Sequence, residues 1–64
     1  MLESRKLEQH DLNYWQERAT SEMQLAQRAA TMDIARPHYR LAMSYLEKVE
    51  ELKRRLRWRQ RAEA

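Results

Sequence analysis

The stretch Thr31-Met32-Asp33-Ile34-Ala35-Arg36-Pro37 decides the fold, because it holds the only proline of a 64-residue chain that has no glycine. Apolar residues repeat with helical spacing on both sides of this stretch. Along one unbroken helix, however, the two apolar sectors would point about a quarter turn apart. A break near residues 31–37 removes this conflict, so the sequence predicts two helices joined by a turn at residues 31–36.

The chain before the turn is predicted to form a helix over residues 5–30. Its apolar residues recur at spacings of three and four, and they therefore gather on one side of an amphipathic helix. These residues are Leu12, Trp15, Ala19, Met23, Ala26 and Ala30.

The chain after the turn is predicted to form a second helix over residues 37–61. Pro37 is tolerated in a first helical turn, because the amides there have no partners within the helix. Thr31 or Asp33 can accept a hydrogen bond from one of those amides. The second helix has the spacing of a surface that packs on another helix. The residues with this spacing are Ala42, Tyr45, Val49, Leu52 and Leu56.

Two such helices are expected to pack antiparallel, so the predicted fold class is all-α, a helical hairpin that forms a single domain over residues 1–64. In this arrangement facing residues have numbers that add up to about 71, and small side chains meet large ones. The predicted hairpin seam consists of Trp15, Ala19, Met23, Ala26, Ala30, Leu41, Tyr45, Val49, Leu52 and Leu56.

An alternative fold remains open at this point. A single long helix, kinked at Pro37, could pair antiparallel with a second copy of the chain. The absence of glycine, which is the usual terminator of a helix, leaves this alternative open.

A second apolar set lies outside the predicted seam, and a monomer would leave much of it in water. Contiguous exposed apolar surface on a small protein marks an interface. We therefore expect a homodimer that forms a four-helix bundle, or a hairpin docked on a partner protein. The plainer interpretation is that these residues widen the core of a monomer. The predicted interface consists of Leu7, Tyr14, Leu25, Met32, Tyr39, Met43 and Leu46.

Length and composition also favour association. A chain of this size buries only roughly 60% of the surface that its unfolded form exposes, so one small core stabilises it weakly. Disulfides and a zinc finger are excluded as additional support, because the chain has no cysteine. No stretch approaches the roughly 20 apolar residues of a membrane span, and Met1–His10 lacks the apolar run of a signal peptide. The expected location is the cytoplasm.

Charge is concentrated at the end of the second predicted helix, where six of the nine residues from Lys53 to Arg61 are basic. Arginine forks fit phosphate oxygens, and an aromatic ring among them can stack on an unpaired base. RNA or single-stranded DNA is therefore one expected partner, and an anionic membrane surface or an acidic protein is another. The plainer interpretation is a solvated helix end whose cations are favoured by the helix dipole. The candidate binding residues are Arg54, Arg55, Arg57, Trp58, Arg59 and Arg61.

Residues for catalysis or metal binding form no recognisable pattern. His10 and His38 lie in different segments and lack acidic ligands at helical spacing. His38 is expected to lie on the seam in the first turn of the second helix, as a packed and hydrogen-bonded histidine. A phosphate-binding glycine loop is excluded, and no serine has an adjacent histidine and acid. We expect no catalytic residues, no metal and no cofactor. The expected function is a non-enzymatic interaction or scaffold module that self-associates or docks on a partner, and the alternative is a regulatory nucleic-acid-binding protein.

Three segments carry a resemblance to known sequences: Tyr14–Ala19, Ala26–Ala29 and His38–Leu46. Together they resemble a group of small bacterial proteins of helical-hairpin type over about 40 residues. The resemblance implies a helical hairpin and brings no activity with it.

Overall fold

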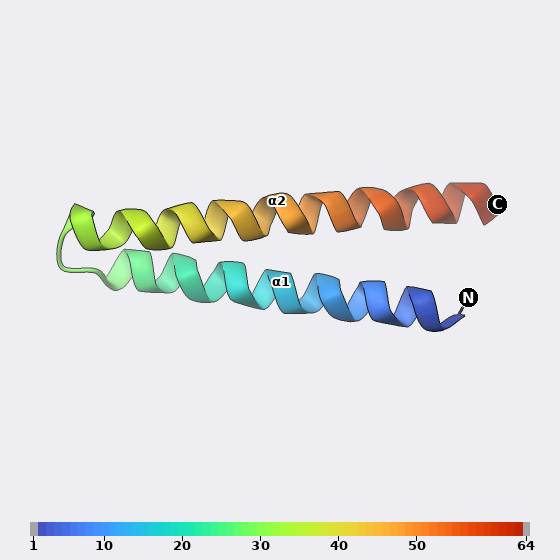
Figure 1. Cartoon of the computed structure of the whole chain (residues 1–64), viewed down its shortest axis with the longest axis horizontal. Coiled ribbons are helices and arrows are strands. Elements are labelled where there is room, and N and C mark those ends of the chain that lie inside the picture. Colours follow the sequence, from blue (N-terminus) through green and yellow to red (C-terminus); the bar gives the residue numbers. More distant parts are fainter. Residues whose placement is uncertain (1, 64) are drawn as a thin grey trace.

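The computed structural model describes the backbone of residues 2–63 and the side chains of residues 9–62. It contains two helices, α1 (Leu2–Arg28) and α2 (Met32–Glu63). They run side by side in opposite directions, so the start of α1 and the end of α2 lie at the same end of an elongated hairpin (Figure 1). The predicted all-α antiparallel two-helix hairpin is confirmed. We call the end that holds both termini the open end.

The turn lies earlier than the sequence predicts. It spans residues 29–31, whereas the prediction placed it at 31–36 and ended the first helix at residue 30. Thr31 begins the new helix, because its Oγ1 accepts a hydrogen bond from the amide of Ile34 at 3.3 Å and its carbonyl accepts one from Ala35 at 3.0 Å. This is the geometry of an N-cap, one of the two options that the sequence left open.

Pro37 consequently lies inside α2 instead of at its start. It has no amide to donate to the carbonyl of Asp33, four residues earlier, so one helical hydrogen bond is absent next to the first turn. The predicted second helix of 37–61 is corrected to 32–63. The proline does not break the helix, and the threonine cap sets the boundary.

Buried residues of the hairpin recur at intervals of seven. Leu12, Ala19 and Ala26 do so on α1, and this period is the mark of a coiled-coil seam. On α2 the buried residues with this interval are Ala35, Ala42 and Val49, and Leu52 is buried beside them. Four of these seven apolar residues are alanine, and we call them the alanine seam: Ala19, Ala26, Ala35 and Ala42.

Among residues 9–62, the large apolar side chains that are buried lie in the half toward the open end. There Leu12, Val49 and Leu52 form a cluster, and the partly buried Trp15 and Leu56 pack against it. We call these five residues the open-end core. No large side chain among residues 9–62 is fully buried, so the core of a single hairpin is thin.

The predicted pairing of the helices is wrong. Glu22 faces His38 and Trp15 faces Tyr45, and in both pairs the residue numbers add up to 60 instead of about 71. The difference of eleven residues is three helical turns, so nearly the same sides of the helices meet but with different partners. The earlier turn explains the shift. It also removes two residues from the predicted seam, because Ala30 lies in the turn and Leu41 is 41% exposed.

Candidate interaction surfaces

Large apolar side chains lie exposed on the hairpin in unusual number. Nine of them within the described residues are at least one-third exposed, and eight of the nine flank the helix pairing on α1 or α2. They are Tyr14, Leu25, Met32, Ile34, Tyr39, Leu41, Met43, Leu46 and Trp58. The first eight divide into two surfaces, one on each side of the plane that contains the helix axes.

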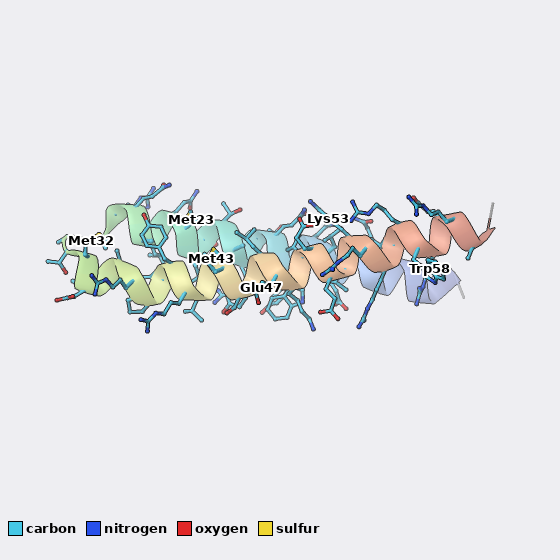
Figure 2. All side chains as sticks on the ribbon, turned by 90° about the horizontal axis from the view of Figure 1, so that it is seen from above. Met23, Met32, Met43, Glu47, Lys53 and Trp58 are labelled. Carbon is cyan, nitrogen blue, oxygen red and sulfur yellow. The ribbon has the colours of Figure 1, made fainter. Side chains whose placement is uncertain are left out.

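The first surface contains a groove between the helices. Its volume is about 560 Å³, its floor is formed by Ala19 and Val49, and Met23 and Leu46 form its apolar walls. Figure 2 shows Met23 and Lys53, another residue of the groove, along one long edge of the hairpin. The groove therefore has an apolar floor and polar edges.

The apolar side chains around this groove form what we call the methionine surface: Met23, Met32, Tyr39, Met43 and Leu46. Tyr39, Met43 and Leu46 follow one another at spacings of four and three, which places them on the side of α2 that borders the groove. Met32 precedes Tyr39 by seven residues and continues the same side toward the turn.

The methionine surface has few charges on its α1 side. The residues of α1 that line the groove beside Ala19 and Met23 are uncharged: Gln16, Thr20, Gln24 and Gln27. The charged residues of the groove, Glu50 and Lys53, lie on α2 toward the open end. Depletion of charge together with methionine and aromatic side chains is the composition of the centre of a protein interface.

The opposite side of the hairpin carries what we call the leucine surface: Tyr14, Leu25, Ile34 and Leu41. Charged residues occupy the same helical positions, since Arg18 precedes Leu25 by seven residues and Lys48 follows Leu41 by seven. The guanidinium of Arg18 lies over the Tyr45 ring, 5.6 Å from its centroid. A hydrogen bond to Tyr45 is the main cause that raises the pKa of Arg18 above its usual value. A partner on the leucine surface would therefore have to cover permanent charges.

The predicted interface residues do not lie on one surface. Tyr14 and Leu25 belong to the leucine surface, whereas Met32, Tyr39, Met43 and Leu46 belong to the methionine surface. The side chain of Leu7 lies outside the described residues. Sequence reasoning missed Ile34, and it placed the exposed Leu41 in the seam. The seven-residue interval of the buried positions is the signal that separates the two sides.

The seam holds two polar residues, His38, which the sequence predicts there as a hydrogen-bonded histidine, and Glu22, which sequence reasoning missed. Glu22 is only 6% exposed, and its Oε2 lies 2.6 Å from Nδ1 of His38 across the helix pair. Its other oxygen lies 3.7 Å from Nη2 of Arg18. Glu22 falls between Ala19 and Ala26 at helical spacing, which placed it in the seam despite its charge. This pair links the two helices near the turn.

The remaining predicted seam residues occupy the sides of the helices that meet. Ala19, Ala26, Val49 and Leu52 are buried, and Trp15, Met23, Tyr45 and Leu56 are half-buried. The indole of Trp15 lies 5.3 Å from the ring of Tyr45 and 5.0 Å from the ring of Tyr14, measured between centroids.

The basic end of α2 lies beyond both apolar surfaces. Trp58 is 71% exposed, and Figure 2 shows it near the open end of the hairpin. Arg54 precedes it by four residues and Arg61 follows it by three, so all three share one side of α2, and Arg57 is also exposed. Two other arginines have partners of their own. Nη2 of Arg55 bonds Oε1 of Glu51 at 2.8 Å, and the half-buried Arg59 is also engaged.

Comparisons of the chain with known protein families, with curated proteins and with solved structures find no match. The resemblance to small bacterial hairpin proteins therefore stays a prediction. Neither helix, over its described residues, is both long enough and apolar enough to span a membrane.

Proposed function

We propose that the protein is a non-enzymatic helical module that self-associates through its exposed apolar side chains, with a homodimeric four-helix bundle as its working form. One observation carries this proposal. No large side chain of residues 9–62 is fully buried, while nine large apolar side chains are at least one-third exposed. The hairpin thus presents on its outside the residues that would fill a larger core.

Energetics support the proposal. A buried methylene contributes about 0.8 kcal/mol, and ordering the backbone of one residue costs about 1–2 kcal/mol. An alanine buries one methyl group, so the alanine seam offsets little of that cost. Small proteins with thin cores are stabilised by disulfides, metals or association, and a chain without cysteine has no disulfides. Association brings additional apolar side chains out of water without any new residue.

The molar mass in solution tests the proposal directly. Light scattering after size exclusion is expected to give twice the chain mass of 7.9 kDa. The unfolding temperature is expected to rise with protein concentration, because association stabilises only the folded state. A monomer at every concentration, with an unfolding temperature independent of concentration, would contradict self-association.

A variant with one charge on each apolar surface shows whether these surfaces are used. Met43→Glu/Leu25→Glu is expected to give a monomer, because a carboxylate on whichever surface forms the contact would have to be buried without a partner. Ser44→Glu/Ser21→Glu is the matched control, since both serines are exposed polar residues on the same two helices. An unchanged mass of the first variant would show that neither surface is the contact.

A second candidate function is the binding of RNA or single-stranded DNA at the basic end of α2. The specific observation that favours it is the 71% exposure of Trp58, with Arg54 and Arg61 on the same side of the helix. Guanidinium groups can hold phosphate oxygens bidentately while an indole stacks on a base. These two kinds of contact reinforce each other only for a single-stranded ligand whose bases are accessible.

Fluorescence anisotropy of a labelled single-stranded RNA tests this second function. Trp58→Ala is expected to weaken binding about tenfold, in line with about 1–3 kcal/mol for one stacked base. Tyr14→Ala is the control, because Tyr14 is an exposed aromatic residue of α1, outside the basic end of α2. The affinity of the intact chain is expected to fall steeply between about 50 and 200 mM salt. Equal binding by both variants would exclude Trp58 as the base-stacking residue.

A further inference from the structure

We infer that the methionine surface binds a second copy of this chain, with α2 antiparallel to α2 of the second copy and a two-fold axis at Met43. The inference rests on the proposed self-association. It adds which of the two apolar surfaces forms the contact and in which direction the second hairpin runs.

The choice of surface follows from the charges around each one. On the methionine surface, the α1 residues that border the groove are uncharged glutamines and a threonine. On the leucine surface, Arg18 and Lys48 alternate with the apolar residues, and Arg18 already covers the Tyr45 ring. Burial of a charged group without a partner is costly, so a second copy fits the methionine surface better.

The direction follows from the order of charges along α2. Arg36 lies seven residues before Met43, and Glu50 lies seven residues after it. Seven residues are close to two helical turns, so both charged residues lie on the same side of α2 as Met43. Arg40 lies three residues before Met43 and Glu47 lies four residues after it. The same order of charges is thus repeated one helical turn closer to Met43. The charges on the two sides of Met43 are therefore opposite in sign.

An antiparallel second copy makes use of this order. It places Arg36 against Glu50 of the second copy, and Arg40 against Glu47 of the second copy, and the two-fold axis produces each pair twice. A parallel α2 would instead place arginine against arginine. All four side chains are exposed, and within the described residues none of them forms an ion pair with its own hairpin. Charges at the edge of a helix pair set its orientation more than its affinity.

The centre of this contact is apolar. The axis places Met43 against Met43 of the second copy, and Tyr39 against Leu46 of the second copy. Methionine side chains adapt to irregular gaps, which suits a contact between two identical residues on the axis. A self-complementary patch of this kind is what a two-fold dimer requires.

A cysteine cross-link tests the position of the two-fold axis. The chain has no cysteine, so only the introduced residue can form a disulfide. Met43→Cys is expected to form a disulfide-linked dimer on mild oxidation, since a residue on the axis meets its own copy within disulfide reach. Leu25→Cys is the matched control on the leucine surface, with 49% exposure against 58% for Met43. It is expected to cross-link only slowly, at the rate of random collision.

Reversal of the charges tests the direction independently of the cysteine variants. Arg36→Glu is expected to raise the dissociation constant of the dimer about tenfold, which corresponds to about 1.4 kcal/mol. Arg36→Glu/Glu50→Arg restores the opposite-sign pairs and is expected to recover the original constant within about twofold. Circular dichroism of each variant checks that the helices are intact.

The outcomes separate this inference from the proposed self-association. If the unmodified chain is a dimer, but Met43→Cys cross-links no faster than Leu25→Cys and the double reversal recovers nothing, self-association stands and the antiparallel contact at Met43 is refuted. If the unmodified chain is a monomer at every concentration, both are refuted. Preferential cross-linking of Leu25→Cys would assign the contact to the leucine surface and overturn the inference.

Discussion

The two halves of the hairpin bury different side chains and expose different ones. Toward the open end, leucine, valine and tryptophan fill the space between the helices, and arginine and glutamate predominate outside. Toward the turn, the helices meet through alanines, and seven of the nine exposed large apolar residues lie between Leu25 and Leu46. In the turn half, therefore, mainly alanines lie between the helices, and the large apolar side chains lie on the outside of the hairpin. The comparison shows one half that packs large apolar residues between its helices and one that leaves its large apolar residues exposed.

The largest effect is expected from the open-end core. Leu52→Ala removes a buried leucine from the cluster with Leu12 and Val49, and such truncations destabilise by about 2–5 kcal/mol. For so small a protein this is a large part of the whole free energy of unfolding. Thermal unfolding followed by circular dichroism is expected to show a chain that is largely unfolded at room temperature.

Leu25→Ala is the matched control, because Leu25 is a leucine of the turn half on the leucine surface. It is expected to change the unfolding temperature little. Equal losses from the two leucines would contradict the division of the hairpin into a half with a core and a half with an exposed apolar surface.

The alanine seam is expected to be destabilised by a larger side chain, whereas the open-end core is destabilised by a smaller one. Ala42 is fully buried, at 0% exposure, and Ala42→Leu would push the helices apart. Overpacking of this kind costs about 1–3 kcal/mol. Chemical denaturation measures the change, and Ala62→Leu, at an exposed position of α2, supplies the control for helix propensity. A more stable Ala42→Leu variant would mean that the seam contains unfilled space.

The sequence predicted the two helices of the hairpin but not the position of the turn between them. The helical period of the apolar residues sufficed for two antiparallel helices. The position of the turn did not follow, because Pro37 is the most visible helix breaker in the chain, whereas Ala29 and Ala30 are good helix formers. When the register shifts by three helical turns, nearly the same sides of the two helices still meet. The apolar pattern alone therefore could not distinguish the predicted pairing from the observed one.

The surfaces were harder to predict than the fold. Glu22 is charged, and charged residues are rarely buried unless they are paired, so only its position between Ala19 and Ala26 indicated the seam. Tyr14 and Met43 both lie outside the seam, and which side each takes depends on where the partner helix lies. That information comes from the pairing of the two helices.

Loss of one partner of the buried polar pair is expected to destabilise the hairpin about as much as overpacking of the alanine seam, whereas replacement of both partners is expected to cost little. His38→Ala leaves the Glu22 carboxylate buried with only Arg18 nearby, which costs about 1–3 kcal/mol. Glu22→Leu/His38→Leu removes both polar groups and is expected to be no less stable than the original chain.

The exposed ion pair between Arg55 and Glu51 is the comparison. Arg55→Ala breaks this pair and is expected to cost only about 0.3–0.5 kcal/mol. Urea denaturation of the three variants gives the order, and a costlier Arg55→Ala would reverse the argument.

A moderate effect, larger than that of Arg55→Ala, is expected at the helix cap that begins α2. Thr31→Ala removes the side-chain acceptor of the Ile34 amide and is expected to cost about 1 kcal/mol, whereas Thr31→Ser keeps the acceptor and most of the stability. Thermal unfolding at a fixed protein concentration measures both, since association also shifts the unfolding temperature.

Pro37→Ala separates the role of the proline from that of the cap, because it returns one backbone hydrogen bond and leaves Thr31 unchanged. If the cap sets the start of α2, Pro37→Ala keeps the hairpin and its mass while Thr31→Ala weakens it. A loss of the hairpin on replacement of the proline alone would restore Pro37 as the residue that turns the chain.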